Sequence, residues 1–515
     1  MADGASRSTG AGVAARAGVA AGAGRAARGA ARAAAVRLNA AVGLHPTVGR
    51  LVAELEISRA WLVDPATGRE GPGEVIVRQG ILDTVIWLEG TDAEGIDPHG
   101  VVVAPGFIDL HAHFREPGFE DAETIATGSA AAAHGGFTTV CVMPNTLPAI
   151  DQVSVLSQVR QRAAQSGSPV ELLAYGAVSL GRAGETLAAL GELADGGAIG
   201  FSDDGAPVRS AALLRSALLY AGMLGRPIVD HAEDTGLTEG AEASEGLVAT
   251  ILGLRGWPVA AEAGAVARDL AVLADVLDDE PRARLHLTHL STGAALELVR
   301  RAKAAGLPVT CDVTPHHLAL TDEWLAGARR WAWEALGADG RARDTWADGA
   351  IVAAPYDPAL RVNPPLRSAV DAAAVLAALL DGTADAVATD HAPHTRVDKD
   401  VEFGLAANGI PGIETALGLL LAAVDAGHLP LRRAIAALTS GPAGVLAGTG
   451  WAGARGLIEG APADLVVFDR SASWVVETAA LRSRGKHSPL LGRTLAGRVM
   501  LTVAGGRVAY EDDAE

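Results

Sequence analysis

Apolar and polar residues alternate along this chain in two different ways. Short alternating runs, typical of strands with one buried face, occur near both ends of the chain. The first are LEISRAWLVD (55–64) and GEVIVRQGILDTVIWL (73–88), and the last are ADLVVFDRSASWVV (463–476) and GRVMLTVAGGRVAYED (497–512). Strand-rich ends around a long middle predict one small β domain built from both termini.

The middle of the chain alternates short apolar runs with Ala- and Leu-rich segments of helical length. Helical segments include 151–166, 210–223, 260–279 and 293–305. Eight strand–helix repeats predict an α/β fold, a (β/α)8 barrel of the TIM type, with its chemistry at the carboxyl ends of the strands. The eight predicted strands are 107–113, 137–143, 171–178, 198–202, 227–231, 284–290, 308–313 and 384–390.

These patterns divide the chain into a tail and two domains. Residues 52–103 and 456–513 form the predicted β domain, and residues 104–455 form the barrel. Within the barrel, 322–352 breaks the rhythm with four tryptophans and several charges. We expect an insertion there, and its role as a lid, a contact surface or a packed excursion stays open.

The first fifty residues, 1–50, differ from all that follows. They are rich in Ala and Gly, with seven arginines and one acid, Asp3, for a formal charge of +6. An Arg-rich, acid-poor segment is sometimes a transit peptide, but this composition favours a disordered tail, or an over-extended start site, that takes no part in the fold.

Bulk composition narrows the class of protein. The 515 residues are 49% hydrophobic, which is enough for a large core. No uninterrupted apolar run reaches the roughly 18 residues of a membrane span, so no membrane partner is expected. The net charge of −19 argues against nucleic-acid binding. Two cysteines, Cys141 and Cys311, indicate a reducing, cytoplasmic setting rather than a disulfide framework.

The stretch GFIDLHAHFREPG (106–118) places two histidines one residue apart at the end of an apolar run. In an extended strand, alternate side chains share a face, so His111, His113 and Arg115 are expected together, with Asp109 beside them. Two adjacent imidazoles suit a divalent metal, and a guanidinium suits a substrate carboxylate.

Further imidazoles and carboxylates stand at the ends of other predicted strands. They are Asp203 and Asp204 in FSDDG, His231 in DHAED, His286 and His289 in HLTHLS, and Asp390, His391 and His394 in TDHAPH. His286 lies three residues before His289, so it is expected to face away and to be structural. The clustering at one rim of a barrel predicts a metal site.

The predicted ligands are sufficient for two metal ions. We assign His111, His113 and Asp390 to one ion and His231 and His289 to the other, with Asp204 as a bridge. A hydroxide shared by two such ions can act as a nucleophile.

The motifs that surround these residues resemble those of bacterial dihydroorotases of the amidohydrolase superfamily, in particular the Bacillus-like type. They are DLHAHFREPG, GGFTTVCVMPNTLP, FSDDG, HAED, THLST, TPHHLALTD, VNPPLRS and ATDHAPHT, and the resemblance covers about residues 52–510. It implies a distorted barrel with a β-sandwich, two zinc ions bridged by an aspartate and a hydroxide, and reversible cyclisation of N-carbamoyl-L-aspartate to L-dihydroorotate in pyrimidine biosynthesis.

One feature of the metal bridge follows from the sequence itself. Many members of the superfamily use a carboxylated lysine on strand four, but this chain has no lysine before Lys303. Another anionic group must therefore bridge the two metal ions. Asp204 occupies the position, relative to His231, at which the resembling subgroup carries an aspartate, and Asp203 stays as its competitor because the strand is already ending there.

The resemblance also implies roles around the substrate. Asp390 would be the catalytic proton carrier. Arg115, Asn145 and His394 would hold the substrate α-carboxylate, with a guanidinium fork, an amide and a ring donor. The remaining implied contacts are His113, Asn363, Asn408 and Gly409. Relatives often carry an aromatic residue where this chain has Asn408, so ring contact at that position is open.

Two rival interpretations remain at this point. An allantoinase or hydantoinase would share the barrel and the His-x-His pair, although the run Arg115–Gly118, MPNT and the aspartate bridge favour dihydroorotase. A non-catalytic partner of aspartate transcarbamoylase would lack ligands, and none is missing here. An active enzyme that forms a homodimer, or that binds aspartate transcarbamoylase, is compatible with the sequence.

Overall fold

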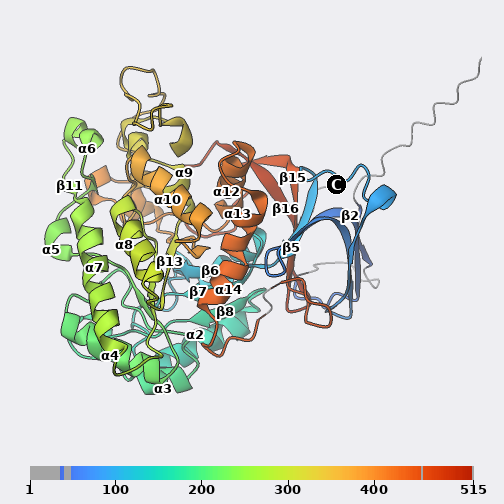
Figure 1. The fold of residues 1–515 in the computed structure, drawn as a ribbon, viewed down its shortest axis with the longest axis horizontal. Coiled ribbons are helices and arrows are strands. Elements are labelled where there is room, and N and C mark those ends of the chain that lie inside the picture. Colours follow the sequence, from blue (N-terminus) through green and yellow to red (C-terminus); the bar gives the residue numbers. More distant parts are fainter. Residues whose placement is uncertain (1–34, 40–47, 454–455, 513–515) are drawn as a thin grey trace, which may run out of the picture. The chain divides into compact units, whose positions relative to one another are not determined.

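The computed structural model describes residues 48–453 and 456–512, together with the backbone of a strand at 35–39. The described chain has two kinds of sheet (Figure 1), one largely antiparallel and one parallel with helices packed around it. Among the described helices, none combines the length and the apolar character needed to cross a lipid bilayer.

The antiparallel sheet draws its strands from both ends of the chain. Its order is β17-β16-β15-β5-β2-β3-β4, with β1 on β2, and only β2 and β5 pair in parallel. Valine, leucine and isoleucine on alternate positions fill a separate core, which includes Leu55, Ile57 and Val467. The strands are β1 (Ala35–Asn39), β2 (Glu54–Asp64), β3 (Arg69–Arg78), β4 (Ile81–Trp87), β5 (Val101–Pro105), β15 (Leu465–Val475), β16 (Thr494–Ala504) and β17 (Arg507–Glu511).

Parallel strands follow the sequence order through the middle of the chain. One group pairs as β6-β7-β8 and another as β9-β12-β13-β14. Their bounds are β6 (Phe107–Ala112), β7 (Phe137–Val142), β8 (Glu171–Ala174), β9 (Ile228–Asp230), β12 (Leu285–Leu287), β13 (Val309–Val313) and β14 (Ala386–Val387). A short parallel pair, β10 (Ala243–Ser244) with β11 (Gly256–Trp257), lies outside this series.

Isolated parallel bridges connect the two groups. Phe201 pairs with Gly176 on one side and with Ile228 on the other, so the predicted strand 198–202 is reduced to a single bridging residue. Ala112 pairs with His391, which returns the series to its first strand. The carboxyl ends of all these segments therefore face the same side, where the site lies.

Helices fill the intervals between the strands. The four predicted helical ranges, 151–166, 210–223, 260–279 and 293–305, match observed helices to within three residues at either end. Side-chain caps explain several helix starts. Thr292 accepts the backbone N–H of Ala295, and Ser368 that of Asp371. The helices are α1 (Ile125–His134), α2 (Val153–Ser166), α3 (Leu190–Asp195), α4 (Ala211–Met223), α5 (Thr235–Thr238), α6 (Leu247–Leu252), α7 (Val259–Val276), α8 (Gly293–Ala304), α9 (Pro315–Ala319), α10 (Ala369–Asp381), α11 (Arg396–Lys399), α12 (Ala416–Asp425), α13 (Leu431–Leu438) and α14 (Ser440–Val445).

The N-terminal tail prediction needs one correction. Residues 35–39, within the segment expected to stay outside the fold, form β1 and pair antiparallel with Glu54–Ser58. The pairing uses backbone groups along one edge of β2, which a prediction based on composition does not detect. Residues 1–34 and 40–47 lie outside the described part of the chain.

The tryptophan-rich insertion packs largely against the rest of the fold. Trp324 is fully buried, and the rings of Trp331 and Trp333 stack with centroids 5.8 Å apart. The guanidinium of Arg493, from the end of the chain, lies 4.4 Å from the centroid of the Trp331 ring. These contacts favour the interpretation that the insertion packs onto the fold as a structural addition, although Trp346 stays about one-third exposed.

Asp322, at the start of the insertion, makes stability depend on pH. Burial and the charges of Glu323 and Asp371 raise its pKa from 3.8 to about 7. Folding therefore takes up a proton between these values, and this group destabilises the fold progressively as the pH rises from about 4 to about 7. We expect Asp322→Asn to raise the apparent unfolding temperature at pH 8 by about 2 °C or more and to flatten its pH dependence.

The measurement is thermal unfolding of both proteins from pH 4 to pH 8. Asp278→Asn, at an exposed position on the same chain, is the control and is expected to change neither quantity. A variant at position 322 that is less stable than the wild type at pH 8 would contradict the assignment of an unfavourable buried charge.

Candidate metal and substrate site

Six predicted metal-ligating residues converge at the carboxyl ends of the parallel strands. His111 and His113 come from β6 and the residue after it, His231 follows β9, and His289 follows β12. All six are at most 6% exposed. Together with substrate-contact candidates, five of them line a cavity of about 160 Å³, and the lining residues are His113, Arg115, Asn145, Asp204, Gly205, His231, His289, Asn363, Asp390, Ala392, His394, Asn408 and Gly409.

Hydrogen bonds on the outer side of three imidazoles set their tautomers. His113 Nδ1 lies 2.8 Å from Asn145 Oδ1, and His231 Nε2 lies 2.8 Å from Glu233 Oε2. Both oxygens only accept, so these nitrogens carry the proton. His111 Nδ1 lies 2.7 Å from Thr288 Oγ1, and the Thr288 hydroxyl in turn donates to Asp312 Oδ1 at 3.3 Å. The inward nitrogens are therefore left as lone-pair donors, an arrangement typical of metal-binding histidines.

The inward nitrogens lie unusually close to one another. His111 Nε2 is 3.2 Å from His113 Nε2, and His231 Nδ1 is 2.9 Å from His289 Nε2. Two lone pairs at such distances repel unless a proton or a cation lies between them. Two groups of donors can each hold a metal ion, namely His111 with His113 and Asp390, and His111 with Asp204 and His289.

Asp204, rather than Asp203, faces the imidazoles. Its carboxylate oxygens lie 3.4 Å from His111 Nε2 and 3.4 Å from both His231 Nδ1 and His289 Nε2. The Asp203 carboxylate points to the segment after β8, where it accepts the N–H groups of Val178 and Ser179 and the hydroxyl of Ser179. The geometry therefore favours Asp204 as the shared ligand.

Electrostatics keeps the two site carboxyl groups ionised. Burial on its own would raise the pKa of Asp204 and of Asp390, but the neighbouring imidazoles outweigh it and lower both. Burial likewise opposes charge on His111, yet Asp204 and Asp390 raise its pKa to about 9. The cavity thus attracts positive charge, and divalent cations can replace the protons on these imidazoles. Imidazole and carboxylate donors of this kind fit zinc.

Three residues of this site have a strained backbone. Arg115, His289 and Asp390 have φ angles of +60°, +41° and +46°, in the left-handed region that non-glycine residues rarely adopt. The prediction that strand alternation aligns Asp109, His111, His113 and Arg115 therefore holds only for the two histidines. Arg115 reaches the cavity through its left-handed turn. The Asp109 side chain instead accepts the N–H of Thr389 and so fixes the strand end.

Arg115 and His394 form a pair of donors beside the metal ligands. His394 Nε2 lies 2.7 Å from the carbonyl oxygen of Asn408 and so carries a proton. Arg115 Nη2 lies 3.2 Å from the same nitrogen. Burial and the Arg115 charge lower the pKa of His394 to about 3, so the ring is neutral. Because this ring nitrogen already donates to Asn408, it cannot accept from Arg115 Nη2, and a bound carboxylate would give the guanidinium an acceptor.

The other predicted substrate contacts, Asn363, Asn408 and Gly409, differ in their hydrogen bonds and backbone requirements. Asn363 donates through Nδ2 to Glu233 Oε2 at 3.1 Å. The Asn408 side chain accepts from Arg361 Nε, so only the backbone of Asn408 contacts His394. Gly409 has a φ of +133°, and an added Cβ would lie 2.5 Å from the Ala392 carbonyl oxygen. A glycine is therefore needed there.

Several residues that support the site were not selected from the sequence. Glu233 connects His231 to Asn363, and Asp312 accepts the backbone N–H of His289 and bonds His286 Nε2 at 2.8 Å. His286 is thus structural, as expected. Glu233 lies two residues after His231 in HAED, so strand alternation was a signal that could have identified it.

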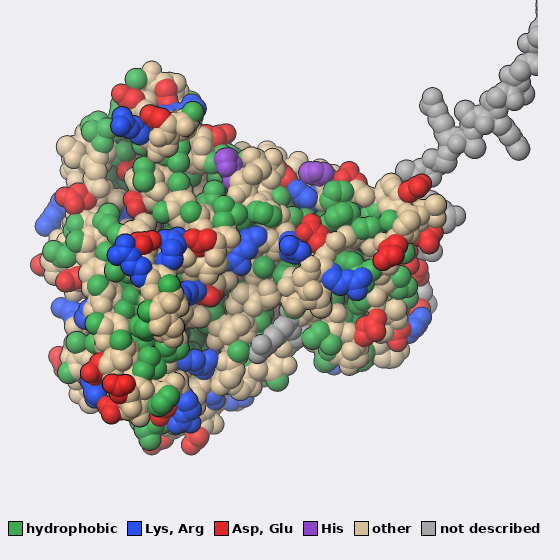
Figure 2. All heavy atoms as spheres, viewed as in Figure 1, with side chains coloured by type: hydrophobic (Ala, Val, Ile, Leu, Met, Phe, Trp, Pro, Cys, Tyr) green, Lys and Arg blue, Asp and Glu red, His purple; other side chains and the backbone are tan. Residues whose placement is uncertain are grey.

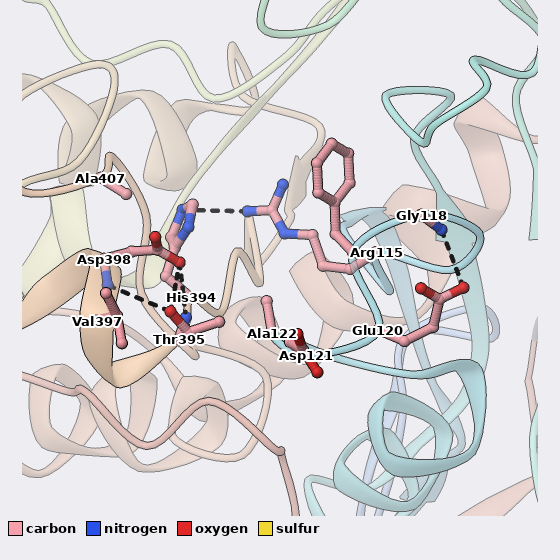
Figure 3. A pocket seen from close by; sticks show the side chains of 11 residues that line it. Arg115, Gly118, Glu120, Asp121, Ala122, His394, Thr395, Val397, Asp398 and Ala407 are labelled. Carbon is pink, nitrogen blue, oxygen red and sulfur yellow. Dashed lines mark hydrogen bonds between the residues drawn. The ribbon is translucent and has the colours of Figure 1, made fainter.

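A larger pocket of about 920 Å³ opens beside the cavity (Figure 3), and Arg115 and His394 line both. The guanidinium of Arg115 points towards the His394 imidazole in this view. Glu120 and Asp121, from the loop after β6, and Asp398, from α11, line the same pocket. The donor pair therefore belongs both to the larger pocket and to the cavity that the metal ligands line.

Comparison with known proteins decides the family. Residues 100–292 match a protein family described as Dihydro-orotase-like. A curated dihydroorotase from Anaeromyxobacter dehalogenans is 45% identical over 88% of this chain and 96% of its own length. The chain belongs to the dihydroorotase family. Another dihydroorotase, from Pelotomaculum thermopropionicum, is 42% identical over 89% of this chain and 99% of its own length.

Solved structures agree with the fold of this dihydroorotase family member. L-Hydantoinase from Arthrobacter aurescens superposes with a TM-score of 0.70 at 24% identity, over 88% of this chain and 95% of that one. Dihydropyrimidinase from Brevibacillus agri gives a TM-score of 0.70 at 20% identity, over 89% and 95%. At such identities the likeness concerns the fold.

Proposed function

We propose that this protein is a dihydroorotase that catalyses the reversible, metal-dependent cyclisation of N-carbamoyl-L-aspartate to L-dihydroorotate in pyrimidine biosynthesis. One observation carries the proposal. A single cavity is lined by five of the six buried metal-ligating side chains and by the donor pair Arg115 and His394. A cyclic amide that bears a carboxylate needs metal ligands near the amide and hydrogen-bond donors for the carboxylate. The names of the curated relatives support the same reaction.

The architecture that we propose is a distorted (β/α)8 barrel over residues 104–455, with residues 52–103 and 456–513 forming a β-sandwich. The parallel bridges at Phe201 and between Ala112 and His391 support a closed barrel. The separate core of the antiparallel sheet supports a distinct domain. The insertion at 322–352 would be an addition to the barrel.

Two zinc ions per chain would be held by the convergent donors. His111, His113 and Asp390 would hold one, His231 and His289 the other, and Asp204 both. When bound, zinc lowers the pKa of water towards about 7 and polarises a carbonyl group. The inward lone pairs and the two ionised carboxylates described above support this assignment.

Asp390 would move the proton during the reaction. In hydrolysis, a water oxygen attacks the ring carbonyl carbon and the carbon–nitrogen bond breaks. Asp390 would accept the proton of that water and deliver it to the leaving nitrogen. In the direction of ring closure it would take the proton of the ureido nitrogen. Its Oδ1, 3.1 Å from His113 Nε2, lies among the metal ligands, where the reacting group must bind.

The substrate α-carboxylate would be held by Arg115, Asn145 and His394. Asn363, the backbone of Asn408 and Gly409, and His113 all line the same cavity and would contact the ring. The position of Arg115 and His394 in the cavity, beside the metal ligands, supports this orientation. It also explains a preference for a substrate with a carboxylate.

Arg115→Ala is expected to raise KM for L-dihydroorotate by about 10- to 100-fold, because a charge-assisted hydrogen bond contributes about 1.5–3 kcal/mol. Metal content is expected to stay unchanged. Steady-state kinetics and metal analysis check both. The control is Arg396→Ala, whose side chain is 82% exposed on α11 and which should behave as the wild type. An unchanged KM for Arg115→Ala would remove this residue from the carboxylate site.

A substrate panel tests the proposed function itself. L-Dihydroorotate, allantoin, hydantoin and dihydrouracil are offered to the purified, zinc-loaded enzyme. We expect turnover of L-dihydroorotate to exceed that of the others, which lack its carboxylate, by at least about a hundredfold. Preference for allantoin or hydantoin would reassign the protein to the rival cyclic-amide hydrolases.

The expected setting is the cytoplasm, which two buried, unpaired cysteines fit. The substrate is a small molecule. Basic and acidic side chains are interspersed on the face seen in Figure 2, which suits the expectation that nucleic acid is no partner. A homodimer and a complex with aspartate transcarbamoylase stay predictions.

A further inference from the structure

The connection between β15 and β16 leaves the antiparallel sheet and reaches the substrate site. Its base is closed by backbone bonds between Val476 and Arg493 and between Gly492 and Val476, at 2.9 and 2.8 Å. Its inner part, Ser483 to Gly485, packs behind the segment after β14. A domain with no ligand of its own thus contacts the residues that carry the proposed chemistry.

Glu123, just before α1, holds this connection in place. It is fully buried, and its carboxylate accepts the hydroxyl of Ser483 at 2.6 Å and the backbone N–H of Arg484 at 3.1 Å. The same carboxylate lies 3.4 Å from His391 Nε2. Buried carboxylates that accept several hydrogen bonds are rigid, because each lost bond leaves a buried charge less solvated. The connection and the segment around His391 are therefore fixed to one point.

Gly485 lies directly against Pro393 and His394. A Cβ at this position would be 2.6 Å from Pro393 Cβ, and 2.9 and 3.0 Å from the backbone O and N of His394. Its φ is not in the left-handed region, so space, rather than conformation, requires the glycine here. Two of these three neighbours are backbone atoms, which cannot give way by a rotamer change.

The atoms that Gly485 touches carry the donor pair. The carbonyl oxygen of Pro393 accepts from Arg115 Nε at 3.2 Å, and His394 supplies the ring next to Arg115 Nη2. A displacement of this backbone would therefore move both donors relative to the metal ligands.

We propose that Ser483 and Gly485 are positioning residues, through which the small domain sets the geometry of the carboxylate-binding pair Arg115 and His394. The inference rests on the proposed function, since it takes that pair to bind the substrate α-carboxylate. It assigns the β15–β16 connection a part in substrate recognition, although none of its residues lines the catalytic cavity.

The test is Gly485→Ala, with L-dihydroorotate as substrate. We expect KM to rise by about tenfold or more, with kcat within about threefold of the wild type. Bound zinc should stay close to that of the wild type, whereas the unfolding temperature should fall somewhat because the added Cβ displaces backbone atoms. The matched control is Gly71→Ala in the antiparallel sheet, where an added Cβ meets nothing within 4 Å. A purely structural role would instead lower kcat, metal content and stability together.

Ser483→Ala is the second variant, and it removes one donor to Glu123 without adding bulk. We expect a smaller rise in KM of the same kind, about threefold or more. If Gly485→Ala does not fold, the KM of Ser483→Ala tests the positioning role on its own. An active wild type whose KM is unchanged in the folded variants would overturn the inference. A wild type without dihydroorotate turnover would overturn the proposed function instead, so the two failures are distinguishable.

Discussion

Asp390→Asn is expected to lower kcat for L-dihydroorotate by about a thousandfold or more, while most of the bound metal is retained. An amide cannot accept the proton of the attacking water, and positioned proton transfer contributes about 10²–10⁴ in rate. Metal retention follows because His111 and His113 keep their outer hydrogen bonds to Thr288 and Asn145, and with them the orientation of their inward nitrogens.

The matched control is Asp400→Asn, which removes an exposed carboxylate that pairs with Arg396 near the outer pocket. It should leave kcat, KM and metal content unchanged. Rates for Asp390→Asn near those of the wild type would exclude Asp390 as the proton carrier. A large loss of metal together with activity would make it chiefly a ligand.

The second large effect is expected at the shared carboxylate. Asp204→Asn should lose at least one bound zinc per chain and lower kcat by about a hundredfold or more, because the charge that faces His111, His231 and His289 disappears. Metal analysis after equilibration with zinc, together with steady-state kinetics, measures both quantities.

Asp203→Asn separates the two neighbouring aspartates. Its carboxylate accepts three hydrogen bonds from Val178 and Ser179, so this variant should unfold at a lower temperature but keep its zinc. Loss of metal in Asp203→Asn, with metal retained in Asp204→Asn, would reverse the assignment of the shared ligand.

Hydrophobic periodicity was sufficient to predict most of the fold. The four helices with predicted ranges and seven of the eight predicted parallel strands occur near their expected positions, because their buried faces require a regular pattern. The fourth strand is only a bridge at Phe201, since the chain turns at once into the segment that presents Asp204. Strand β1 was missed because edge pairing depends on backbone groups, which leave little trace in the sequence.

The composition of the candidate site was easier to predict than its geometry. Residue types at strand ends identified the imidazoles and carboxylates, because parallel strands bring their carboxyl ends together. Alternation failed for Arg115, whose left-handed φ of +60° turns the side chain back towards His394. The choice between Asp203 and Asp204 as the shared ligand also needed the three-dimensional structure, since neighbouring residues at a strand end follow no fixed alternation.

Local sequence patterns could not identify the supporting residues that come from distant parts of the chain. Glu123, Ser483 and Gly485 pack behind the segment around His394 from positions far apart in sequence, and only the tertiary contacts of the β15–β16 connection relate them. Thr288, just after β12, orients His111, and Asp312 lies on the neighbouring strand β13, and no local motif reveals the register that brings them together.

We propose that metal ions held by this histidine–aspartate cluster drive hydrolysis of a carboxylate-bearing cyclic amide. The most direct measurement is the turnover of L-dihydroorotate by enzyme stripped of metal with a chelator and then titrated with zinc. We predict no turnover after stripping and full recovery at about two zinc ions per chain. Turnover that survives stripping, or a zinc-loaded enzyme that leaves L-dihydroorotate unchanged, would contradict the account.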